Sequence, residues 1–182
     1  MSVCRGLAGF LSGSGFLVFF MRNYSNVLVI SFLVVLLDQM TKWLVKAHVP
    51  FLSSINVFSW FDITHLRNPG IAFGMLRNMS EDIRLYFYIV VFVLVLAVIF
   101  FFLRRLEEEQ RIFRYAIALV LGGAIGNSID RFAYGYVTDF IAVYWPGNPQ
   151  LLWPPFNVAD SAITVGAISI LISGVVWRDK ES

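Results

Sequence analysis

The sequence predicts an all-α integral membrane protein with four transmembrane helices and a small extracytoplasmic β-sheet after the first helix. Hydrophobic residues make up 58% of the 182 residues and charged residues only 14%, whereas soluble domains are roughly a quarter charged. Mean hydropathy is +0.73. The cleanest charge-free window, Leu85–Leu103, has 19 residues, close to the roughly 20 that a helix needs to cross a bilayer. Such unbroken apolar runs exclude the alternating pattern of a transmembrane barrel.

Charge-free windows place the four spans at residues 23–46, 84–103, 114–131 and 160–177. The first is the least regular, because it carries charges in its later half. Residues 21–182 then form a single membrane domain, and residues 1–20 an N-terminal extension. The extension is apolar after Arg5 and faintly resembles a signal peptide, but it lacks a small-residue cleavage site. We therefore favour Met21 as the biological start.

The distribution of Lys and Arg predicts the orientation of the spans. Eight of these residues lie in the segments that share one side, namely the N-terminus, residues 104–114 and the C-terminus. Only three lie in residues 47–83 and 131–159 on the other side. Both termini are therefore expected in the cytoplasm.

Several chemistries find no support in the sequence. A net charge of +2 is too balanced for nucleic-acid binding through phosphate neutralisation. The single cysteine, Cys4, rules out an internal disulfide framework and a zinc cluster with Cys ligands. His48 and His65 do not have the spacing of a His-Glu-x-x-His site, and we interpret both as surface residues. No metal site and no Gly-x-Ser-x-Gly nucleophile motif is predicted.

The two external segments differ in their predicted structure. Residues 54–66 mix β-branched and aromatic residues before an Asn-Pro-Gly turn signal, which predicts the small sheet. We expect Trp60 and Phe61 of this segment to lie at headgroup depth. Residues 145–155 are rich in Pro and Trp and predict an irregular interfacial loop with aromatic anchors.

Four carboxylates are expected to converge near the outer interface. At 1.5 Å per helical residue, Asp38 and Asp130 each lie in the outer half of a span. Asp139 follows the third span, and Asp160 opens the fourth from the same side. Ionisable groups are costly within a membrane, so each is a functional candidate.

Local spacing suggests structural roles for three of these acids. Asp38 and Lys42 form an i,i+4 pair that favours a buried ion pair. Asn127, Asp130 and Arg131 share a helix face, and we interpret Asp130 as salt-bridged to Arg131. The spacing of Asn157 and Asp160 suits a helix N-cap, so capping is an alternative role for Asp160.

Asp139 lies in an apolar stretch without an adjacent base, so no local structural role explains it and a functional role is favoured. Glycines 122, 123 and 126 are expected to permit close helix packing.

Five segments together resemble the ordered motifs of the lipoprotein signal peptidases (signal peptidase II). They are DQMTK at 38–42, NPGIAF at 68–73, GNSIDR at 126–131, VTDF at 137–140 and FNVADS at 156–161. Each motif is weak alone, but five in order on the outer side are highly specific. Thr138 stands where the family commonly has Val, and the segment between the last two motifs is slightly long.

The resemblance implies a bacterial inner-membrane aspartic endopeptidase that cleaves diacylglyceryl-modified prolipoproteins just before the lipidated Cys of the lipobox. Its catalytic pair matches Asp139 and Asp160. The family's supporting polar residues match Asp38, Lys42, Asn68, Asn127, Asp130, Arg131 and Asn157. It also implies inhibition by globomycin-type compounds, contact with membrane lipid, a monomer, and no cofactor or nucleic-acid partner.

Aspartic chemistry agrees with two carboxyls sharing one site, because they cannot both ionise cheaply and one keeps a proton. Two other classes remain to be compared. A small ion-coupled transporter would use the acids as a proton relay, but it should place polar groups through both leaflets or in paired repeats. An intramembrane protease of the Gly-x-Gly-Asp type would need a motif that this sequence lacks.

Overall fold

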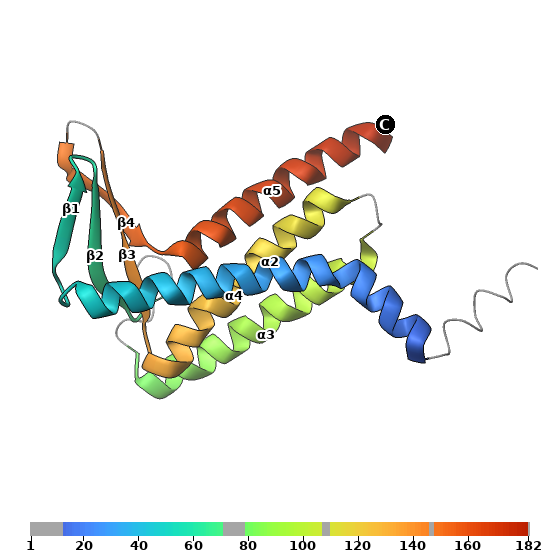
Figure 1. The fold of residues 1–182 in the computed structure, drawn as a ribbon, viewed down its shortest axis with the longest axis horizontal. Coiled ribbons are helices and arrows are strands. Elements are labelled where there is room, and N and C mark those ends of the chain that lie inside the picture. The colour runs from blue at the N-terminus through green and yellow to red at the C-terminus, as the bar shows by residue number, and fades with distance from the viewer. Residues whose placement is uncertain (1–12, 71–78, 107–109, 146–147, 182) are drawn as a thin grey trace, which may run out of the picture.

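The computed structural model describes residues 13–70, 79–106, 110–145 and 148–181. Four helices run roughly lengthwise, and a β-sheet stands across one end of them (Figure 1). In chain order, the helices are α2 (Gly13–His48), α3 (Glu81–Arg105), α4 (Arg111–Tyr134) and α5 (Val158–Glu181). The sheet is built from the segments between α2 and α3 and between α4 and α5.

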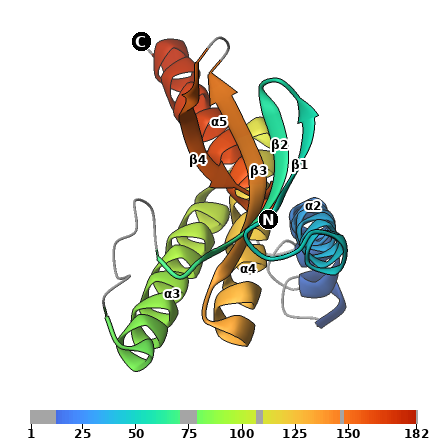
Figure 2. The same cartoon turned by 90° about the vertical axis from the view of Figure 1, so that its left-hand side faces the viewer.

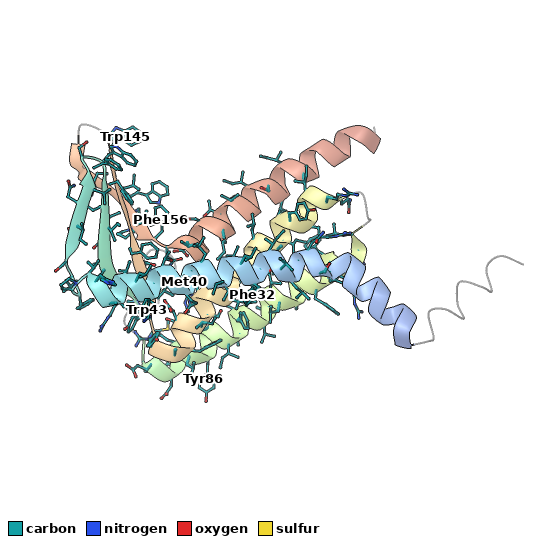
Figure 3. The ribbon with its side chains drawn as sticks, in the orientation of Figure 1. Phe32, Met40, Trp43, Tyr86, Trp145 and Phe156 are labelled. Carbon is teal, nitrogen blue, oxygen red and sulfur yellow. The ribbon has the colours of Figure 1, made fainter. Side chains whose placement is uncertain are left out.

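The helices have the length and surface of membrane spans. Over the described residues, three are long and apolar enough to cross a bilayer: Tyr24–His48 within α2, α3 and α4. A shorter apolar stretch covers Val158–Gly174 of α5. Large apolar side chains face outward from the bundle, as Figure 3 shows for Phe32, Trp43 and Tyr86. This is the surface of a protein whose solvent is lipid.

The predicted first span, residues 23–46, lies within α2, where the apolar stretch long enough to cross a membrane is Tyr24–His48 over the described residues. Helix α2 begins at Gly13, because the apolar residues that precede Arg22 contain no proline and continue the helical run. Residues 1–12 of the predicted extension lie outside the described residues.

Helix α4 lies at the centre and packs against α2, α3 and α5. Its glycines permit this approach, as predicted. A Cβ at Gly126 would lie 2.7 Å from Oδ2 of Asp38 in α2, and one at Gly123 would overlap the carbonyl oxygen of Ala159 in α5. Any side chain at these two positions would force the polar ends of the helices apart.

Helix α4 ends at Tyr134, and the chain turns at the next residue, Gly135. Gly135 adopts the left-handed conformation (φ +74°), and its N–H donates to the carbonyl of Arg131 at 3.0 Å. Glycine takes this conformation without steric cost. The chain therefore turns directly from the polar end of α4 into the sheet.

The sheet has four antiparallel strands in the order β1-β2-β3-β4, seen side by side in Figure 2. They are β1 (Ser54–Phe58), β2 (Phe61–Asn68), β3 (Val137–Trp145) and β4 (Asn148–Phe156). The first two strands were predicted. The prediction that residues 145–155 are irregular was wrong for the part that the structure describes, because residue 145 ends β3 and residues 148–155 lie in β4. Strand β4 is an edge strand, where prolines that donate no backbone hydrogen bond are tolerated.

Pairing within the sheet brings two motifs together. In the β2–β3 register, Leu66 lies opposite Asp139, and Asn68 lies opposite Val137. Residues about 70 positions apart in the chain therefore meet at the end of the sheet nearest the helices.

The two histidines have different environments. His48 is exposed, as predicted. His65 was wrongly interpreted as a surface residue, since it is only 4% exposed. Its Nδ1 lies 2.8 Å from the carbonyl oxygen of Val49, and its ring meets the edge of Phe51. His65 therefore connects strand β2 to the residue that follows α2.

Candidate active site

A fully buried ion cluster joins α2 to α4. The ammonium of Lys42 lies 2.8 Å from Oδ2 of Asp38 and 3.3 Å from Oδ2 of Asp130, and all three side chains are 0% exposed. It also donates to Oδ1 of Asn127 at 2.9 Å. One cation therefore serves two carboxylates from different helices. Burial is tolerated because each charge is paired and hydrogen-bonded.

This cluster also holds the backbone just before each of the two remaining acids. Asp38 Oδ1 accepts from the N–H of Ala159 at 3.0 Å, and Asp130 Oδ2 accepts from the N–H of Thr138 at 3.0 Å. Ala159 directly precedes Asp160, and Thr138 directly precedes Asp139. Asp38 thus fixes the backbone just before Asp160, and Asp130 fixes the backbone just before Asp139.

Three asparagines hold the carboxylates of Asp139 and Asp160. Asn157 donates from Nδ2 to Asp139 Oδ1 at 2.8 Å, and Asn68 donates from Nδ2 to Asp139 Oδ2 at 3.0 Å. Asn127 donates from Nδ2 to Asp160 Oδ1 at 2.7 Å. Because Lys42 binds the other end of the Asn127 amide, that amide has one possible orientation. Both carboxylates are therefore fixed in place, and no cation of the described residues forms an ion pair with either of them.

Asn157 contacts both acids because it caps α5. Its Oδ1 accepts from the N–H of Asp160 at 2.9 Å, and its own N–H donates to Asp160 Oδ2 at 3.2 Å. This reciprocal pair is the capping box that the spacing predicted. Asp160 therefore takes part in the helix cap and also shares Asn157 with Asp139, so the capping role does not exclude a second one.

The surroundings of Asp139 favour its protonated form. Burial, followed by the negative charge of Asp160, raises the pKa of Asp139 from 3.8 to about 6, although the amides of Asn68 and Asn157 oppose the shift. The side chain is only 4% exposed. A carboxyl with this pKa can hold or release a proton near neutral pH.

Both acids face a groove of about 650 Å³, a size typical of ligand pockets. One wall comes from the end of β4, and another from the first two turns of α5. The lining residues are Asn68, Gly70, Arg131, Val137, Asp139, Trp153, Pro154, Pro155, Phe156, Asp160, Ser161, Thr164 and Val165. The groove is thus polar at the acids and mostly apolar elsewhere.

The predicted salt bridge between Asp130 and Arg131 is absent from the described residues. Asp130 pairs instead with Lys42, because residues adjacent on a helix point in different directions. Arg131 lies over the ring of Tyr88 at 5.3 Å and donates weakly to the carbonyl of Asn127 at 3.4 Å. It lines the groove rather than the buried cluster.

All nine residues singled out from the sequence lie in this region, in three settings. Asp38, Lys42 and Asp130 form the buried cluster; Asn68, Asn127 and Asn157 hold Asp139 and Asp160; and Arg131 lines the groove. Residues 71–73 of the second motif lie outside the described residues. Sequence reasoning missed Trp153 and Thr164 as lining residues. The proline pair at 154–155 was the available signal that this segment is held in one conformation.

Known proteins with similar sequences share one activity. Residues 30–176 match the family described as Signal peptidase (SPase) II. The chain is 42% identical over 160 residues to the lipoprotein signal peptidase of Syntrophotalea carbinolica, covering 87% of this chain and 95% of that one. It is 39% identical over 148 residues to that of Desulforapulum autotrophicum, covering 81% and 90%.

A solved structure has a similar fold. A bacterial membrane enzyme solved by the in meso method at 2.3 Å superposes with a TM-score of 0.75 at 30% identity, covering 87% of this chain and 92% of that chain. The fold and these matches define a membrane-embedded aspartic peptidase. Specifically, the chain belongs to the signal peptidase II family.

Proposed function

We propose that Asp139 and Asp160 are the catalytic pair and that they cleave diacylglyceryl-modified prolipoproteins just before the lipidated Cys. One observation carries this proposal. Two carboxylates from different segments share Asn157 and face an open groove, whereas the other two acids of the region are buried and bound to Lys42.

The reaction follows from a pair that holds one proton. The ionised member accepts a proton from water as the water oxygen attacks the scissile carbonyl carbon. The protonated member donates to the carbonyl oxygen as negative charge develops there. Collapse of the tetrahedral intermediate breaks the C–N bond, and a proton passes to the leaving amine. We assign the proton to the pair and not to one aspartate, since coupled carboxyls titrate together.

The remaining polar residues support this pair without reacting. Asn68, Asn127 and Asn157 occupy one lone pair on each of the four carboxylate oxygens, together with the backbone N–H of Asn157. The remaining lone pairs of these carboxylate oxygens therefore point in fixed directions. This is the preorganisation that general acid–base catalysis needs. Arg131 lines the groove and supplies donors for a substrate carbonyl.

The groove suits a substrate that is part lipid and part peptide. Trp153, Phe156 and Val165 provide apolar walls beside the acids, and Trp153 is 68% exposed. Acyl chains attached to the substrate Cys would stay in the outer leaflet while the adjacent peptide bond reaches the acids. The similarity to lipoprotein signal peptidases of other bacteria supports this substrate class.

We further propose that all four helices cross the bacterial inner membrane, with both termini in the cytoplasm and the site near the outer leaflet. The eight-to-three distribution of Lys and Arg supports this orientation. Reporter fusions in residues 104–114 should be cytoplasmic, and fusions in the β3–β4 hairpin should be periplasmic. The opposite pattern would refute the topology.

We also propose that residues 21–182 form a single membrane peptidase domain that does not require residues 1–20. Deleting residues 1–20 should then leave insertion and turnover unchanged. A truncated protein that inserts normally but does not cleave would show that the extension is required.

Cleavage of a synthetic lipobox peptide tests the activity directly. Purified protein should cleave the peptide whose Cys carries diacylglycerol before that Cys, and should leave the unlipidated peptide intact. Mass spectrometry identifies the cleaved bond. Equal cleavage of both peptides, or cleavage at another bond, would contradict the proposed substrate.

A further inference from the structure

A second cavity lies beside the active-site groove, between the outer ends of α3 and α4. Its volume is about 530 Å³. Its lining residues are Arg67, Pro69, Glu81, Asp82, Arg84, Leu85, Tyr88, Arg131, Phe132, Tyr134, Gly135 and Tyr136. None of the steps proposed above uses this cavity. It also differs from the groove in charge, because it contains three arginines and neither Asp139 nor Asp160.

Two of the three arginines lack a carboxylate partner in the described part of the chain. Arg67 lies over the rings of Phe51 at 4.4 Å and Tyr136 at 4.9 Å. Arg131 lies over Tyr88, and its buried Nε has no hydrogen-bond partner. Aromatic faces hold these guanidinium groups in place and leave N–H donors available, apart from the Arg131 N–H that donates to the carbonyl of Asn127. A buried donor without an acceptor is costly, and an oxygen ligand would remove that cost.

The acids at the rim do not neutralise the cavity. Arg84 is 3.8 Å from Glu81, whose side chain is 94% exposed, so this surface pair is weak. Asp82 is also exposed. Three arginines against two acids leave a charge of +1. Because the guanidinium groups match phosphate geometry, the cavity favours an oxyanion such as a phosphate ester.

Apolar side chains continue from the cavity toward the lipid. Leu85 and Phe132 line it and are 42% and 45% exposed, and Tyr134 is 51% exposed. Arg84 lies in the first turn of α3, and Tyr88 lies one turn deeper in the same helix. The cavity therefore combines arginine side chains with partly exposed apolar ones, at the place where a membrane helix begins.

We propose that this cavity binds the phosphate headgroup of an anionic outer-leaflet phospholipid, held by Arg67, Arg84 and Arg131, with its acyl chains along Leu85 and Phe132. The diacylglyceryl group of the substrate is neutral and does not satisfy three arginines, so charge separates this lipid from the substrate. Arg131 lines both spaces, so the bound lipid would restrain one wall of the groove. The lipid site itself does not depend on the proposed function.

Thermal unfolding of the full chain in a non-ionic detergent tests the site. The probes are dioctanoyl phosphatidylglycerol, dioctanoyl phosphatidylcholine and inorganic phosphate. Phosphatidylglycerol at about ten times its Kd should raise Tm by about 3–5 °C. Phosphatidylcholine should give a clearly smaller shift, since its choline repels the arginines. Inorganic phosphate should also give less, because it has no acyl chains.

Matched variants assign the shift to the cavity. Arg67→Gln and Arg84→Gln should each at least halve the phosphatidylglycerol shift, and the double variant should abolish it. Arg104→Gln removes the same charge from the other end of α3 and should keep the full shift. If a Gln variant is unstable, Arg67→Lys and Arg84→Lys keep the charge but lose the bidentate geometry, and should reduce the shift.

Three results would overturn the proposal. One is a full phosphatidylglycerol shift in the folded double variant. The second is an equal shift with phosphatidylcholine, which would mean that charge is not recognised. The third is an equal shift with inorganic phosphate, which would mean that the ligand is a free anion and not a lipid.

Discussion

The two acid pairs of this protein lie side by side and differ in their counter-charge. Asp38 and Asp130 are 0% exposed and share the ammonium of Lys42. Among the described residues, the carboxylates of Asp139 and Asp160 accept from side-chain amides and one backbone N–H, and they face a groove of about 650 Å³. The carboxylates of the first pair are in contact with a buried ammonium, whereas the second pair, which contacts no cation among the described residues, is proposed to share a proton. A direct cation thus distinguishes the pair that we propose to be structural from the pair that we propose to be catalytic.

The two pairs are also physically connected. Asp38 binds the N–H of Ala159, and Asp130 binds the N–H of Thr138, so each scaffold acid holds the residue before a proposed catalytic acid. Lys42 reaches Asp160 through Asn127. Substitutions of Asp38, Lys42 or Asp130 should therefore alter the geometry and stability of the protein. Substitutions of Asp139 or Asp160 should alter only the rate of cleavage.

The largest expected effect is loss of the carboxyl chemistry. Asp139→Asn and Asp160→Asn should each reduce turnover per folded molecule by at least about 10³-fold, while Tm stays close to that of the wild type. The double variant should be little worse than either single one, because the two groups act as a unit. Turnover and Tm are measured together. Near-normal turnover in either single variant would mean that the wrong pair has been chosen.

The next effect is destabilisation of the scaffold. Lys42→Met removes the one cation shared by two buried carboxylates, and should lower the free energy of unfolding by about 3–5 kcal/mol. Asp38→Asn should cost less, about 1–2 kcal/mol, because Lys42 keeps Asp130 as a partner. Each measurement needs turnover per folded molecule beside it. A stable but inactive Asp130→Asn would place that residue in the chemistry.

A smaller effect is expected on the pH profile. The pKa of Asp139 is raised to about 6, so kcat/KM should fall as pH rises above about 6, where the pair loses its last proton. Asn68 donates to the carboxylate and lowers this pKa. Asn68→Ala should therefore move the alkaline limb to higher pH. A limb that stays in place would show that Asn68 does not act on the titrating group.

The smallest effect concerns the groove wall. Trp153 is exposed and lines the groove without contacting the acids through any hydrogen bond of the described residues. Trp153→Ala should raise KM for the lipidated peptide by about 3–10-fold with little change in kcat, because it removes apolar contact made equally in ground and transition states. Trp145, at the far end of the sheet (Figure 3), is the matched control and should leave KM unchanged when replaced by Ala.

Two predictions from the sequence were wrong because contacts between distant segments decide the structure at those places. Residues close in the sequence were paired too readily, as in the expected Asp130–Arg131 bridge, while Lys42 lies 88 positions from its partner Asp130. Strand β4 was missed because prolines oppose strand formation, and only its neighbour β3 reveals that it lies at an edge. The capping box at Asn157 was predicted correctly, since all its atoms lie within one helical turn.

Hydropathy, periodicity and helix capping act over a few residues. The apolar helices, the cap of α5 and the residue types of the site could therefore be predicted from the sequence alone. Only the tertiary structure decided how the acids divide into pairs. Gly123 and Gly126 let α5 and α2 approach α4, and β2–β3 pairing brings Asn68 to Asp139. A carboxylate's role depends on which cation and which open space lie within a few ångströms of it, and in this chain those neighbours come from distant segments.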